Sequence, residues 1–135
     1  MTYDADDPHL PEAWLAMAPA DRRAAVEAAH HERVDALHRP TLQRNIHVGL
    51  HTTVETLAAQ GEPHVVATLA RITEEGVRRH AAVHMVMEVL ARRMAALAEA
   101  SDPWDDARWR AALDRLDAGE WIGRRMAEDL RPSDP

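Results

Sequence analysis

The sequence predicts an all-α protein, an antiparallel helical bundle of four core helices with short helices at its N- and C-terminal ends. Residues that favour helices, chiefly Ala, Leu, Met, Glu and Arg, dominate the chain. Residues typical of strands are scarce, since Phe is absent and the aromatic residues are four Trp and one Tyr. Prolines and glycines divide the chain into segments of helical length with short connections, which favour antiparallel neighbours.

Each predicted helix has a local signal for its start or its end. Pro11 and Pro63 suit the first turn of a helix. The second helix starts at Pro19 or Asp21, and Thr41 is expected to cap the third. Gly76 either ends the fourth helix or bends it into the next. The predicted helices cover 10–17, 19–38, 41–61, 63–75, 77–100, 102–117 and 120–131.

Length and composition favour one soluble domain over residues 1–135, with 1–9 and 131–135 expected to be flexible. The net charge of -7 disfavours a nucleic-acid partner, because phosphate binding needs a basic surface. The absence of Cys excludes disulfides, iron–sulfur clusters and thiolate zinc sites. The acidic N-terminus lacks the apolar core of a signal peptide, and no apolar run approaches the ~20 residues that span a bilayer. We therefore expect a cytoplasmic protein that does not bind membranes.

A repeated His-x3-His-x3-Glu pattern is the main chemical signal in this histidine-rich chain, which has nine His in all. Residues four apart on a helix are rotated by roughly 40° and raised by roughly 6 Å, so they share one face. Two His pairs on facing helices could hold one ion, and rows extended by Glu suit two ions ~3.5–4 Å apart. The predicted ligands are His47, His51, Glu55, His80, His84 and Glu88.

His30 is a further predicted ligand, because it belongs to an apolar stripe on the second helix. The stripe consists of Val26, His30, Val34 and Leu37, so the imidazole should face inward. A hydrogen-bonded core histidine is the alternative for His30. For Glu55 and Glu88 the sequence leaves open direct ligation, orientation of an imidazole, or a solvated helix face.

The stretches NIHVGLH (45–51) and HAAVHMVMEVL (80–90), with Asp102-Pro103 ahead of Trp109, resemble the bacterial domain-of-unknown-function 1841 family. The resemblance covers roughly residues 27–115 and implies a helical fold and a histidine motif, but no reaction. Asn45-Ile46 replaces the family's Pro-Phe, and Val89 stands where Cys is usual. Five His and two Glu are also similar in number to the ligands of hemerythrin, an analogy that the spacing does not support.

Three functions are compatible with this pattern. The leading hypothesis is a non-haem dinuclear centre that uses dioxygen in redox chemistry or sensing, an oxidoreductase if it is an enzyme. Iron is the favoured metal there, with zinc or manganese as alternatives. The second is a mononuclear four-His site of the zinc type in a protein-interaction bundle. The third is a metal-free helical interaction protein. Homo-oligomer formation is compatible with all three.

Overall fold

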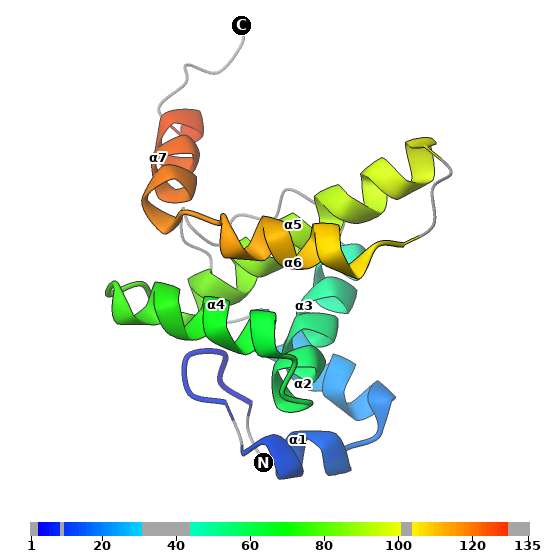
Figure 1. Ribbon diagram of the computed structural model, residues 1–135. Helices are drawn as coiled ribbons and strands as arrows, with labels where there is room; N and C mark the ends of the chain where they lie inside the picture. The colour runs from blue at the N-terminus through cyan, green and yellow to red at the C-terminus, as the bar shows by residue number, and fades with distance from the viewer. Residues whose placement is uncertain (1–2, 9, 31–43, 101–103, 130–135) are drawn as a thin grey trace, which may run out of the picture.

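The computed structural model describes residues 3–8, 10–30, 44–100 and 104–129 (Figure 1). Within these ranges the chain forms seven helices and no strand, which confirms the predicted all-α class. The antiparallel order of the bundle stays a prediction. The helices are α1 (Pro11–Ala16), α2 (Pro19–His30), α3 (Arg44–Ala59), α4 (Pro63–Glu74), α5 (Arg79–Ala100), α6 (Asp106–Asp114) and α7 (Ala118–Asp129).

The structure decides one helix end that the sequence leaves open and places the start of another later than expected. Gly76 adopts a φ of 94°, a left-handed conformation that ends α4 and separates it from α5. The sixth helix begins later than expected, because the Asp105 carboxylate caps it by accepting hydrogen bonds from the backbone N–H groups of Ala107 and Arg108. The expected cap Thr41, the start at Asp102-Pro103 and the predicted continuation of the second helix lie outside the described residues.

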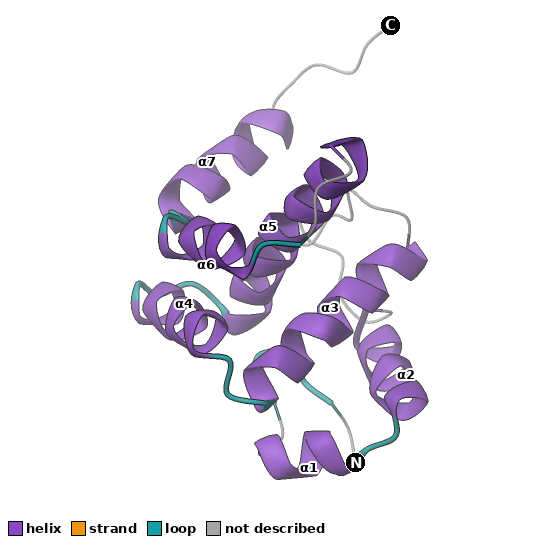
Figure 2. Cartoon of the chain, turned by 45° about the vertical axis from the view of Figure 1, so that its right-hand side comes forward, coloured by secondary structure: helices purple, strands orange, loops and turns teal. Residues whose placement is uncertain are grey.

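Helix α5 is the centre of the larger hydrophobic core. It packs against α3 on one side and against α4, α6 and α7 on others, as Figures 1 and 2 show. None of the helices in the described ranges is long and apolar enough to cross a membrane. The larger core consists of Leu50, Val54, Val65, Leu69, Ile72, Ala82, Val83, Met85, Val86, Met87, Leu90, Trp109, Leu113, Ala118 and Trp121.

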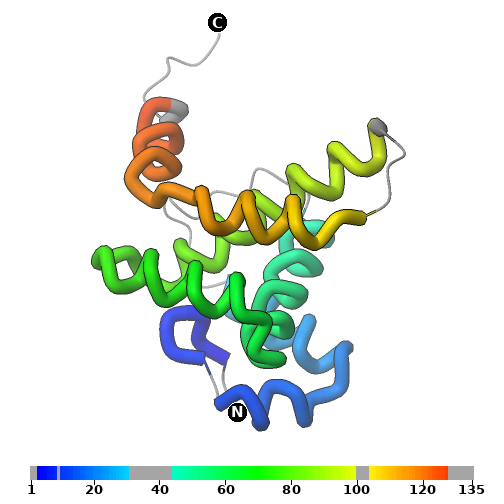
Figure 3. Tube along the Cα trace, in the orientation of Figure 1, coloured from blue at the N-terminus to red at the C-terminus, as the bar shows by residue number. Residues whose placement is uncertain are grey.

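A second, smaller core lies at the other end of the molecule, where α1 and the N-terminal segment meet α2 and α3 (Figure 3). It contains Tyr3, Ala5, Trp14, Val26 and Val48. The sequence predicts a flexible lead-in over residues 1–9, whereas the structure buries Tyr3 and Ala5. The Tyr3 and Trp14 rings lie 5.3 Å apart, so an aromatic contact fixes part of this segment.

Candidate metal centre

Five histidines from three helices meet between the two hydrophobic cores. His30 is the last residue of α2, His47 and His51 lie on α3, and His80 and His84 lie on α5. Four of them form the compact set that we call the histidine cluster: His30, His47, His51 and His84. Each offers one nitrogen, and these four atoms lie within 4.8 Å of one another. All but the partly buried His30 are buried, so the cluster is close enough to hold a metal ion away from bulk water.

His80 lies beside the histidine cluster without belonging to it. Its ring centroid is 4.6 Å from that of His84 and 5.2 Å from that of His51. Its backbone N–H donates a 3.0 Å hydrogen bond to the Asp6 carboxylate, which thereby caps the first turn of α5. The structure thus brings all five predicted histidines together, four of them around one point.

His30 is held in the orientation that a ligand needs. Its Nδ1 donates a 2.7 Å hydrogen bond to the Val26 carbonyl, so that Nε2 carries the lone pair. This Nε2 lies 3.0 Å from Nε2 of His47. Nε2 of His47 therefore donates the proton between them, and a metal ion could bind both nitrogens only if His47 carried its proton on Nδ1 instead.

Tyr3 orients His51 from outside the cluster. The Tyr3 hydroxyl donates its proton to the Glu55 carboxylate, and its oxygen lies 2.9 Å from Nε2 of His51. Because the hydroxyl has a single proton, Nε2 of His51 must be the donor in this second bond. The lone pair of His51 therefore lies on Nδ1. A hydrogen bond of this kind fixes the tautomer and direction of histidine ligands in metal sites.

Glu55 faces an arginine and a tyrosine. Arg79 donates hydrogen bonds of 2.6 and 2.8 Å to its two carboxylate oxygens, and Arg79 also contacts the backbone carbonyl of Ala5. Glu55 is only 4% exposed, so this is a buried two-pronged ion pair. The structure does not place Glu55 in the histidine cluster, and its contact with His51 passes through Tyr3.

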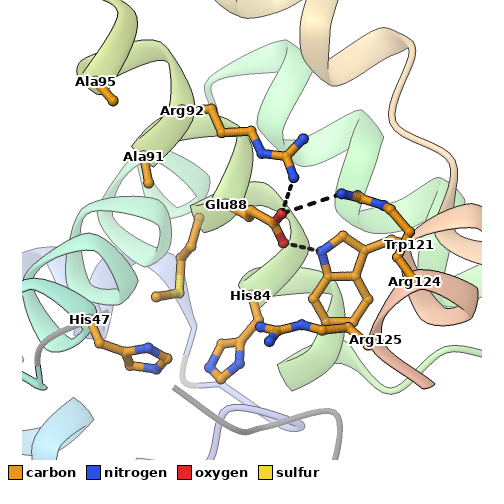
Figure 4. Close-up of a pocket in the computed structure, with 10 residues that line it drawn as sticks. His47, His84, Glu88, Ala91, Arg92, Ala95, Trp121, Arg124 and Arg125 are labelled. Atoms are coloured by element: carbon orange, nitrogen blue, oxygen red, sulfur yellow. Dashed lines mark hydrogen bonds and ion pairs between the residues drawn. The ribbon is translucent and has the colours of Figure 1, made fainter. Parts of the chain in front are cut away.

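Glu88 points toward α7, as Figure 4 shows. Its carboxylate accepts hydrogen bonds from the Trp121 indole N–H and from Arg92, and it forms a longer ion pair of 3.8 Å with Arg124. His47 and His84 lie near the opposite side of the same pocket. The structure does not gather Glu88 with the four histidine nitrogens either. Direct ligation by Glu55 or Glu88 stays a prediction.

The pKa of Tyr3 gives a direct test of its burial. Burial and the adjoining Glu55 carboxylate raise this pKa above the ordinary value of 10.0. The native state therefore keeps the phenol proton at a pH where the unfolded state loses it. The contribution to stability is complete below about pH 10 and falls above it by roughly 1.36 kcal/mol per pH unit.

Tyr3 is the chain's single tyrosine, so the ultraviolet absorption of tyrosinate reports this residue alone. We expect no tyrosinate in the native protein until alkali unfolds the helices, and an ordinary titration in denaturant. The Tyr3→Phe variant should lack the signal altogether. Tyrosinate that forms near pH 10 while the helical circular dichroism is intact would contradict the buried position.

Four neutral imidazoles are a donor set suited to a borderline-soft transition metal, and zinc, copper, iron and nickel all accept such ligands. Zinc–nitrogen bonds of ~2.0–2.1 Å place the nitrogens of a tetrahedral site ~3.4 Å apart. The pair formed by His30 and His47, at 3.0 Å, is already close to that separation. All four nitrogens lie within 4.8 Å of one another, so the residues present are close enough to hold a metal ion.

Sequence reasoning missed Tyr3, Arg79, Asp6 and Trp121, which support the histidines or the glutamates. Comparison of the chain with protein-family models, curated proteins and solved structures finds no match.

Proposed function

We propose that this chain is a helical metal-binding protein whose histidine cluster holds one divalent transition-metal ion. The supporting observation is that four histidine nitrogens from α2, α3 and α5 lie within 4.8 Å of one another. Hydrogen bonds to Val26 and Tyr3 orient two of these imidazoles. Metal-ligating histidines characteristically make hydrogen bonds to such outer partners. Histidines that are merely buried in a core have no physical reason to place their nitrogens around one point.

Zinc is the ion that we favour. The cluster offers nitrogen only, and the two nearby glutamates are engaged by arginines. A closed four-ligand arrangement is typical of structural zinc sites. An ion bound there would join the C-terminal end of α2 to α3 and α5, so the metal would stabilise the contact between the two hydrophobic cores.

The second candidate is a dinuclear iron centre that reacts with dioxygen. The observation in its favour is His80, whose ring lies next to those of His84 and His51 and supplies a fifth nitrogen. This reading requires Glu55 or Glu88 to leave its arginine and ligate an ion, since dinuclear sites in helical bundles use bridging carboxylates. An open coordination position would then support redox chemistry or sensing, with an oxidoreductase activity.

Elemental analysis of the full chain, purified without a polyhistidine tag, distinguishes these proposals. We expect one zinc per chain and a featureless visible spectrum. Two irons per chain with a near-ultraviolet oxo-bridge band would instead establish the second candidate. A chain that retains no transition metal, and takes up none on titration with Zn²⁺ or Fe²⁺, would contradict both.

A further inference from the structure

A pocket of about 350 Å³ adjoins the histidine cluster between α5 and α7 (Figure 4). One part of its lining is the histidine pair His47 and His84, and another is the indole of Trp121. Met87, Ala91 and Ala95 on α5 give it an apolar wall. Its size is within the usual range of pockets that bind small organic molecules.

Positively charged side chains outnumber negatively charged ones in the lining of this pocket. Three arginines line it, against the single carboxylate of Glu88. Arg92 and Arg124 are the two that pair with Glu88. Arg125 instead lies over the Trp121 ring, with its guanidinium carbon 4.9 Å from the ring centroid. The pocket lining therefore has excess positive charge, and Arg125 is the one of its three arginines for which no ion pair with Glu88 is found.

Arg125 is also held in place before any ligand arrives. Its Nε is buried and makes no hydrogen bond within the part of the chain that the structure describes. The cation–π contact with Trp121 positions the guanidinium, and the Glu88 carboxylate holds Trp121 by accepting a hydrogen bond from the indole N–H. In Figure 4 the Arg125 side chain extends along Trp121 toward His84. A buried donor with no acceptor is costly unless a ligand supplies the acceptor.

We infer that this pocket binds a small aliphatic carboxylate. The carboxylate group would accept two hydrogen bonds from Arg125, the geometry that guanidinium and carboxylate share. The aliphatic body would lie against Met87, Ala91 and Ala95, and the ligand would sit beside His47 and His84. The inference rests on the proposed function only for this position next to a metal ion, because the pocket itself is formed by protein side chains.

Isothermal titration of the full chain with hexanoate, hexanol and inorganic phosphate tests this inference. We expect hexanoate to bind with a stoichiometry of one. Hexanol lacks the carboxylate and phosphate lacks the aliphatic chain, so each should bind at least tenfold more weakly. Arg125→Gln should weaken hexanoate binding by about tenfold or more, as expected for the loss of charged hydrogen bonds. Ala91→Leu, which fills the apolar side, should weaken it as well.

Arg108→Gln is the matched control, since Arg108 is an exposed arginine on α6 that pairs with Asp105 outside the pocket. Its hexanoate affinity should equal that of the unmodified chain. Equal affinity in Arg125→Gln, phosphate binding as tight as that of hexanoate, or no hexanoate binding would each overturn the inference. Titration after removal of metal with a chelator separates the two proposals. Hexanoate binding that disappears with the metal and is insensitive to Arg125→Gln would place the carboxylate on the ion and also overturn the inference.

Discussion

Replacement of both His51 and His84 by Gln is expected to abolish stoichiometric metal binding. The two residues come from different helices, α3 and α5, and supply half of the histidine cluster. The two remaining nitrogens, from His30 and His47, cannot complete a four-coordinate site. Gln keeps a polar amide at position 51 that can still donate to Tyr3, so the change removes ligands with little loss of volume.

Loss of the metal should also be visible in stability. An ion that binds only the folded state raises the free energy of unfolding by about 2.7 kcal/mol when its free concentration is 100 times Kd. We expect zinc to stabilise the unmodified chain in this way against urea and to leave the double variant unchanged. Metal content and urea midpoints, with and without zinc, are the measurements.

The control for this experiment is His64→Gln. His64 lies on α4, away from the cluster, and its Nδ1 is 3.0 Å from the Asp114 carboxylate on α6. This variant should bind zinc with unchanged stoichiometry. If the His51→Gln, His84→Gln variant retained one zinc per chain, the ligands would lie elsewhere and the proposed centre would be wrong.

The spacing of the histidines was sufficient to predict where they gather. His47 and His51 are four residues apart on α3, and His80 and His84 are four apart on α5. Both pairs lie on the sides of these helices that pack against each other. The apolar stripe that contains Val26 correctly predicted that His30 faces the same point. Helical periodicity carries this information because it decides which side of a helix is buried.

The directions of the glutamates could not be predicted in the same way. Two steps of four residues rotate a helix position by roughly 80° and raise it by roughly 12 Å, so Glu55 starts at some distance from His47. What the carboxylate then contacts depends on partners that are remote in sequence. Tyr3 reaches Glu55 from the N-terminal segment, and Trp121 reaches Glu88 from α7. No local pattern marks either partner.

The burial of the N-terminal segment escaped prediction for a related reason. Residues 3–8 have neither helical periodicity nor an apolar run, and their acidic composition is typical of a solvated lead-in. Tyr3 is buried because Trp14 and His51 provide a surface for its ring, which is a tertiary effect. Local propensity says little about a segment whose structure depends on contacts with distant elements.

The buried ion pair between Glu55 and Arg79 should have a large effect on stability. In Arg79→Met the Glu55 carboxylate stays buried without its cation, and removal of one partner from a buried pair typically costs about 3–5 kcal/mol. Urea unfolding of the metal-free protein measures this loss. Adding Glu55→Gln to Arg79→Met should restore much of the stability, because the uncompensated charge is then gone.

Arg92→Met is the matched comparison, because Arg92 contacts Glu88, the counterpart of Glu55 in the second motif. That pair is more exposed, with 63% of the Arg92 side chain and 27% of the Glu88 side chain accessible, so we expect a loss within about 1 kcal/mol. Similar losses in Arg79→Met and Arg92→Met would show that burial does not distinguish the two glutamates.

Arg79→Met should also weaken metal binding, which links the ion pair to the centre. Without Arg79, Glu55 no longer has a fixed position from which to accept the Tyr3 proton, and Tyr3 is the group that holds Nε2 of His51. Loss of such an outer partner typically lowers metal affinity by about 10–100-fold. Competition with a chromogenic zinc chelator measures this change, and Arg92→Met serves as the control with unchanged affinity. An unchanged zinc affinity in Arg79→Met would mean that His51 is oriented without the Tyr3–Glu55 chain.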